Sequence, residues 1–327
     1  MDASAKPVTV PPLASAGDVV LSPPDAASTP PTLPTITSPP LTEDVRGDSA
    51  DAGVARDYVF GGLTKDGRVV ATFWDGSLEN LVLLDPKSGK ATFVGYLDDL
   101  LWWQRQLIYD DRTRTAYVLG SSVQNERYLY TLPLDDTTKR TVVMTAPPPS
   151  GAQLSYVLAG TTLTGQLIAA YSTGAGEAIA LLDPATGSAM DVGAFDGLAA
   201  LSGGLAYDAG NGTVYALGLD GSGTARVFSY AQQTRRAGSA ILSGDGGRVE
   251  QAFGVTLDGQ LLVAYWDDVE AVALLDPLTG RAHAVGAFAG LSSWSTQVQY
   301  GGAGGSVVAY GQDARGDYRF YEITLGD

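Results

Sequence analysis

Short apolar runs, separated by turns that contain glycine, recur along the chain from about residue 57 to its end. Three stretches carry this pattern most clearly and can be aligned with one another: GRVVATFWDGSLENLVLLDPKSGKATFVGYL at 67–97, GQLIAAYSTGAGEAIALLDPATGSAMDVGAF at 165–195, and GQLLVAYWDDVEAVALLDPLTGRAHAVGAF at 259–288. Each contains an apolar strand, a loop, a second apolar strand, a turn and a third strand ending in Val-Gly. The alternating, β-rich pattern predicts strands rather than helices.

The turn in each stretch is nearly the same phrase, LLDPKSG at 83–89, LLDPATG at 181–187 and LLDPLTG at 274–280. Aspartate accepts hydrogen bonds from turn amides, proline fixes φ at the first corner, and glycine adopts the left-handed conformation. We therefore interpret the phrase as a tight turn between two strands. A calcium loop around Asp85, Asp183 and Asp276 is the alternative.

A weaker, related half follows each of the three stretches. Its landmarks are a leucine (Leu100, Leu198, Leu291) and, nine residues later, a tyrosine (Tyr109, Tyr207, Tyr300). Each repeat thus holds two units of about 45 residues, the size of a four-stranded propeller blade. The sequence predicts an all-β fold, a six-bladed β-propeller built from three two-blade repeats over 57–327. An array of β-sandwiches is the main rival.

The N-terminal segment has a different character. Ten of the 17 prolines lie within residues 1–45, mixed with Ser, Thr and Ala. Such a Pro-rich extension is expected to be extended and to act as a linker or stalk. The last blade, however, lacks a fourth strand before the chain stops. We predict that part of 34–50 supplies it and closes the ring as an outer strand, where proline is tolerated.

All five tryptophans are expected on or beside one face of the propeller. In each blade the B–C loop and the D–A connection share a face, which we call the tryptophan face. Trp74 and Trp266 end strand B of blades 1 and 5, and the second repeat has Ser172 there. Tryptophan can stack on sugar rings or anchor a protein partner, although it can also simply fill the wedge between blades. The candidate ligand-binding residues are Trp74, Asp75, Trp102, Trp103, Arg105, Trp266, Asp267 and Trp294.

The composition excludes several kinds of site and partner. The chain has no cysteine and a single histidine, His283, so disulfides and zinc sites of several histidines are excluded. The net charge of −16 makes nucleic acid an improbable partner. No apolar run is long enough to span a membrane, and residues after Met1 do not resemble a signal peptide. We expect an exported, extracellular or cell-surface protein whose signal peptide is not in this chain.

The phrasing "LLDPxTG…VG…YD…G.VYAL" resembles that of exported bacterial six-bladed propellers of unassigned function. The resemblance covers residues 57–327 and implies the fold. Some similar propellers are lactonases that hold calcium in the central channel through Glu, Asn and Asp side chains. This chain has only three asparagines, Asn80, Asn125 and Asn211, and none is predicted at the start of a strand A.

Three functions remain open from the sequence. The first is a non-catalytic binding propeller that recognises a glycan or protein through the tryptophan face, without a cofactor. The second is a calcium-assisted, lactonase-like hydrolase with its site in the channel. The third is a structural module of a surface assembly. The oligomeric state has no signal in the sequence.

Overall fold

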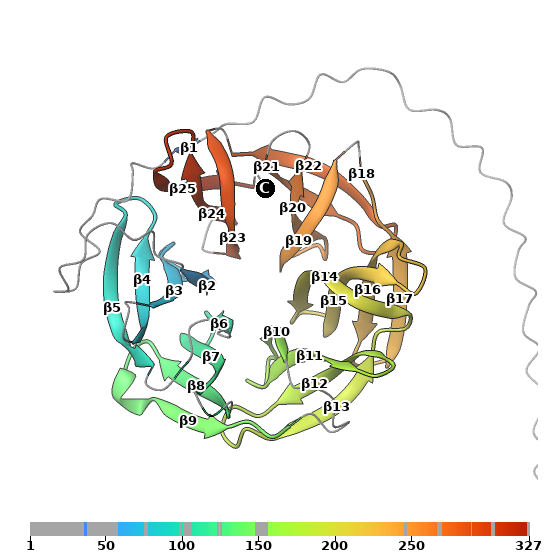
Figure 1. Ribbon diagram of the computed structural model, residues 1–327, viewed down its shortest axis with the longest axis horizontal. Coiled ribbons are helices and arrows are strands. Elements are labelled where there is room, and N and C mark those ends of the chain that lie inside the picture. The colour runs from blue at the N-terminus through green and yellow to red at the C-terminus, as the bar shows by residue number, and fades with distance from the viewer. Residues whose placement is uncertain are drawn as a thin grey trace, which may run out of the picture. The chain divides into compact units, whose positions relative to one another are not determined.

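The computed structural model describes residues 36–37, 58–74, 78–97, 100, 106–122, 124, 126–147, 156–244, 247–266, 270–288, 290–301 and 305–325. Leu33–Asp327 form one compact unit. Its strands form six small sheets, antiparallel except for one short outer strand, arranged around a central channel: the six-bladed β-propeller predicted from the repeats (Figure 1). The described residues include a short 3₁₀ turn at Thr137–Lys139.

In each blade the first strand lies innermost and the last lies at the rim. Blade 1 consists of β2 (Val59–Leu63), β3 (Val69–Trp74), β4 (Glu79–Asp85) and β5 (Lys90–Leu97). Blade 2 consists of β6 (Gln106–Asp110), β7 (Thr115–Ser121), β8 (Arg127–Pro133) and β9 (Thr141–Met144). Blade 3 consists of β10 (Val157–Thr161), β11 (Leu167–Thr173), β12 (Gly176–Leu182) and β13 (Ala189–Ala194).

The second half of the ring repeats this order. Blade 4 consists of β14 (Leu198–Asp208), β15 (Thr213–Asp220), β16 (Ala225–Ala231) and β17 (Arg236–Ile241). Blade 5 consists of β19 (Arg248–Val255), β20 (Leu261–Trp266), β21 (Glu270–Leu275) and β22 (Arg281–Ala287), with the short β18 (Ser243–Gly244) added outside β22. Blade 6 consists of β23 (Leu291–Gly301), β24 (Ser306–Asp313), β25 (Tyr318–Thr324) and β1 (Ile36–Thr37).

Blade 6 takes its outer strand from the N-terminal side of the chain. β1 pairs antiparallel with β25, with Ile36 opposite Glu322 and Thr37 opposite Tyr321. This pairing falls inside the segment 34–50 for which the sequence predicted ring closure.

The recurring phrase forms the turn between strands C and D. In blade 1 the amide of Gly89 donates to the carbonyl of Asp85 at 2.8 Å, and the Asp85 carboxylate accepts from the amide of Lys87 and the hydroxyl of Ser88. Gly89 has a positive φ of 68°, which glycine adopts without strain. The same bonds recur at 183–187 and 276–280, so the turn interpretation is correct.

The core lies between neighbouring blades, where apolar side chains of the facing sheets interlock. The junction of blades 6 and 1, where the ring closes, is rich in aromatic rings: Tyr58, Phe60, Phe73, Tyr310 and Phe320. Each large ring buried in this way contributes on the order of 1.5–3 kcal/mol. The closure therefore rests on side-chain packing in addition to strand pairing.

Candidate functional site

In the odd blades, the tryptophan face includes the end of strand B and the start of strand C. Trp74 ends β3 and pairs across the strands with Glu79, and Trp266 ends β20 and pairs with Glu270. In blade 3 the equivalent pair is Ser172 and Glu177. Cross-strand partners lie on the same face of a sheet, so each glutamate is a direct neighbour of the residue that ends strand B.

The two described tryptophans differ in exposure. Trp266 keeps 39% of its surface accessible, whereas Trp74 is half-buried. The accessible part of an indole can stack on a ligand. Trp74 lies at the same position of its repeat but has less surface to offer.

The other candidate residues are only partly placed. The backbone of Trp294, in β23, lies opposite Gly311 of β24. Leu201, in β14, lies opposite Gly218 of β15, so the two residues occupy equivalent positions in blades 6 and 4. The remaining candidates lie outside the described residues: Asp75, Trp102, Trp103, Arg105 and Asp267.

Three buried glutamates at this face were not recognised as a set from the sequence. Glu79, Glu177 and Glu270 are 0%, 9% and 8% exposed. A signal was present, because each lies six residues before the aspartate of the repeated phrase. That signal is easily overlooked, since a glutamate at the end of a strand is ordinarily solvated and its burial is set by the folded structure.

Burial changes the acidity of these side chains. Burial raises the pKa of Glu177, which the hydrogen bond from Ser172 partly offsets. Burial raises the pKa of Glu270 to about 7, and the negative charge of Glu250 adds to the effect while Arg248 opposes it. Glu270 also has one buried carboxylate oxygen with no hydrogen-bond partner among the described residues. Near neutral pH this carboxyl can therefore either donate or accept a hydrogen bond.

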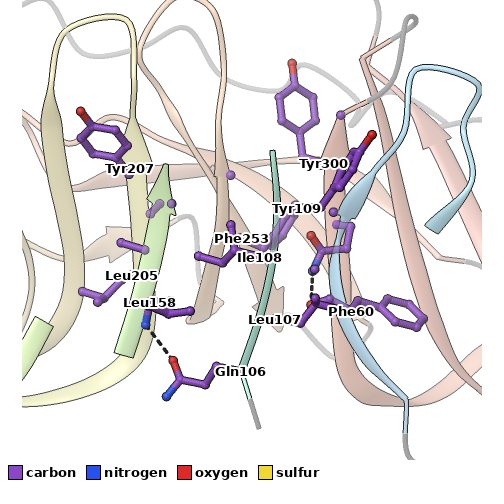
Figure 2. Close-up of a pocket in the computed structure, with 18 of the residues that line it drawn as sticks. Phe60, Gln106, Leu107, Ile108, Tyr109, Leu158, Leu205, Tyr207, Phe253 and Tyr300 are labelled. Atoms are coloured by element: carbon purple, nitrogen blue, oxygen red, sulfur yellow. Dashed lines mark hydrogen bonds between the residues drawn. The ribbon is translucent and has the colours of Figure 1, made fainter. Parts of the chain in front are cut away.

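The central channel forms a cavity of about 610 Å³. Its wall is made by the six innermost strands, and Figure 2 shows apolar side chains along it, among them Ile108, Leu158 and Phe253. The side chain of Gln106 crosses from β6 to β10, accepting from the amide of Leu158 at 2.7 Å and donating to the carbonyl of Tyr156. This glutamine thus connects the inner strands of two neighbouring blades, which have no backbone pairing with each other.

The tyrosines that mark the three repeats gather at one end of the channel. Tyr109, Tyr207 and Tyr300 lie at the same end in Figure 2, away from Gln106. Each packs against a glycine of the preceding blade, with a distance of about 3 Å between the tyrosine Cβ and a Cβ placed on the glycine; the pairs are Gly62–Tyr109, Gly160–Tyr207 and Gly254–Tyr300. Burial and the nearby Asp111 carboxylate raise the pKa of Tyr109 to about 12. The regular spacing of these tyrosines thus has a packing cause.

The described residues contain no group of three or more His, Cys, Asp or Glu side chains placed to hold a metal ion. Nor do they include a helix with the length and apolar character required to cross a membrane.

No family model matches the chain, and no curated protein matches it in sequence. Solved structures match in fold. TolB from Acinetobacter baumannii is 14% identical with a TM-score of 0.50; the match covers 76% of this chain and 61%, under two thirds, of that one. An oligogalacturonate lyase in complex with manganese is 14% identical with a TM-score of 0.53, covering 90% and 81%. The PQQ-bound aldose sugar dehydrogenase of Streptomyces coelicolor is 16% identical with a TM-score of 0.51, covering 90% and 99%. These likenesses establish the six-bladed propeller fold.

Proposed function

We propose that this chain is a non-catalytic binding propeller, exported to the cell surface or beyond, that recognises a glycan through its tryptophan face. The observation that carries the proposal is the pair of Trp266 and Glu270 in blade 5. A partly exposed indole lies directly across the ladder from a buried carboxyl. Sugar rings offer both an apolar face for stacking and hydroxyls for hydrogen bonds, so this pair suits them.

The proposed binding surface extends beyond this pair. Trp74 repeats the arrangement in blade 1 beside Glu79, and ring closure makes blades 5, 6, 1 and 2 successive neighbours. We include the other candidate residues in the proposed surface on the basis of their sequence positions: Asp75, Trp102, Trp103, Arg105, Asp267 and Trp294. A ligand spanning several sugar units would then contact more than one blade.

A glycan array with the purified chain, followed by calorimetry with the best sugar, tests the proposal. The double variant Trp74→Ala/Trp266→Ala is expected to weaken binding at least tenfold, because stacked aromatic anchors carry much of the affinity in such sites. Leu278→Ala is the matched control, since Leu278 is 88% exposed in a C–D turn, away from the tryptophan face. Equal binding by the double variant and the control would remove the proposal. Capture of a protein but no glycan would assign the face to a protein ligand instead.

A further inference from the structure

The outer strand of blade 1, β5, carries two large aromatic side chains that face solvent. Phe93 and Tyr96 are 53% and 47% exposed, and their ring centroids lie 4.7 Å apart. The two residues are three apart in sequence, and in a regular strand such residues point to opposite faces. Their contact therefore requires an irregularity in the strand.

A β-bulge supplies that irregularity. Phe93 lies opposite Val82 and Gly95 lies opposite Leu81, which leaves Val94 as an extra residue in β5. One extra residue shifts the alternation, so Tyr96 comes to the same side as Phe93. The result is a two-ring patch, which we call the aromatic rim patch.

The same bulge occurs in the other two repeats without the rings. In blade 3 the bulge lies at Val192, and the positions equivalent to Phe93 and Tyr96 hold Asp191 and Ala194. In blade 5 it lies at Val285, and the equivalent positions hold Ala284 and Ala287. The frame is thus common to the three repeats, whereas the aromatic pair belongs to blade 1 alone. The fold does not need rings at these positions.

β5 is also an edge strand: among the described residues no further strand pairs outside it, and the Arg140 side chain reaches the Tyr96 carbonyl near its end. It pairs only with β4, whereas the outer strand of blade 5 is covered by β18. At eight residues it is the longest outer strand, and β9 of the next blade has only four. Long, exposed, apolar edges are places where an extended segment of another chain can add a strand.

Cations lie at both ends of the aromatic rim patch. Lys90 is exposed at the start of β5, and Arg140 donates to the carbonyl of Tyr96 at 2.9 Å. The protein as a whole carries 36 acidic and only 20 basic residues. Lys90 lies three residues before Phe93, so it is placed to meet an acidic side chain of a segment docked on the first half of β5, whereas Asp98 and Asp99 follow the strand at its other end.

We propose that β5 binds an extended, acidic segment of a partner protein by strand addition, with an apolar side chain of that segment on Phe93 and Tyr96. A second copy of this chain fits the patch less well. The exposed halves of the two rings offer on the order of 200 Å² per molecule. Stable dimers bury roughly 1,200–2,000 Å² in total. Two copies of this chain would therefore need much more contact area than the patch offers, between molecules that carry the same net charge. A single strand needs less area because its backbone hydrogen bonds add affinity.

The probe for this proposal is a fluorescein-labelled synthetic peptide in which valine and phenylalanine alternate with aspartate, measured by fluorescence anisotropy. Wild-type protein is expected to bind it in the micromolar range. Phe93→Ser/Tyr96→Ser should weaken binding at least tenfold and Lys90→Glu severalfold. Methylation of alternate peptide amides should also weaken binding, because it removes the ladder hydrogen bonds. Val142→Ser/Met144→Ser on the short β9 is the matched control, with exposed apolar side chains on a different rim, and should bind as wild type does.

Several results would overturn the proposal: no binding by wild type at about 1 mM protein, equal binding by the Phe93/Tyr96 variant, or equal loss in the β9 control. A concentration-dependent dimer abolished by the same variant would also overturn it, by assigning the patch to a second copy. Thermal melts of each variant establish that loss of binding is not loss of folding. The patch lies on the rim, so these outcomes are independent of glycan binding at the tryptophan face.

Discussion

Trp266 and Glu270 are direct cross-strand partners at the corner between β20 and β21, one 39% exposed and the other 8% exposed. The exposed ring and the buried carboxyl have different roles. Replacement of the ring is expected to change binding, and replacement of the carboxyl is expected to change stability and its dependence on pH. The two effects are separable by experiment.

Trp266→Ala alone should weaken binding of the best glycan from the array by about 1–2 kcal/mol, which is roughly five- to thirtyfold. The midpoint of thermal unfolding should fall less than for a fully buried ring, since 39% of the Trp266 surface is accessible. Calorimetry and a thermal melt measure the two quantities on the same samples. A large fall in melting temperature with unchanged affinity would show that the ring serves packing between the blades instead.

Glu270→Gln should raise the free energy of unfolding at pH 8 by about 1–3 kcal/mol. The ordinary pKa of the carboxyl is 4.5, and in the folded protein it is about 7. At pH values below both pKa values, the carboxyl is protonated in the folded and in the unfolded protein, so its burial does not lower the free energy of unfolding. As pH rises through this window the unfolded state loses its proton first, so the wild-type protein loses stability, and above it the full cost is present.

Urea unfolding of wild type and Glu270→Gln from pH 4 to pH 8 measures this difference. The two curves of stability against pH should lie closest at low pH and separate as pH rises. Asp196→Asn, which removes a carboxylate in an exposed position, is the control and should follow wild type. Parallel curves for Glu270→Gln and wild type would contradict the assignment of a buried, protonated carboxyl.

Gly160→Ala should destabilise the protein by about 1–3 kcal/mol. A Cβ at this position would lie 3.0 Å from the Cβ of Tyr207, an atom that cannot move without its backbone. Gly174→Ala is the control, because nothing lies within 4 Å of a Cβ placed there. Chemical unfolding of both variants compares them. Equal stability would mean that the inner strands tolerate a wider spacing than the structure shows.

Deletion of residues 1–40 removes β1 and should lower stability by about 1–3 kcal/mol, through lost ladder hydrogen bonds and an exposed β25 edge. Hydrogen exchange should accelerate at Tyr321 and Glu322, the partners of β1. Deletion of residues 1–32 keeps β1 and serves as the control. If the two deletions behave alike, the ring does not depend on this strand, and the Pro-rich segment would be a linker throughout.

Removal of metal ions separates the proposed function from a calcium-assisted hydrolase in the channel. Glycan binding at the tryptophan face should be unchanged after treatment with EDTA, since stacking and hydrogen bonding need no ion. Elemental analysis of the purified protein and a repeated binding measurement with added calcium complete the test. Loss of binding with EDTA and its return with calcium would favour a site with oxygen ligands to the metal.

The repeat pattern was enough to predict the strands, the turns and the number of blades. Asp85 and Gly89 act through local chemistry, which neighbouring residues specify on their own. The positions of Trp74 and Trp266 at the ends of strand B also followed from the alignment of the repeats. Whether these rings are open or buried did not, because exposure depends on the packing of the next blade.

Other features needed residues that are far apart in the chain. Tyr109 recurs at a regular spacing, but its cause is Gly62 on a different blade, which leaves room for it. Phe93 and Tyr96 share a side only because pairing with β4 leaves Val94 unmatched. The sequence by itself determined the period and the turn chemistry, since both are local. Only the tertiary structure decided which glutamates are buried and which rings face solvent, since burial depends on neighbours that the closed ring brings together.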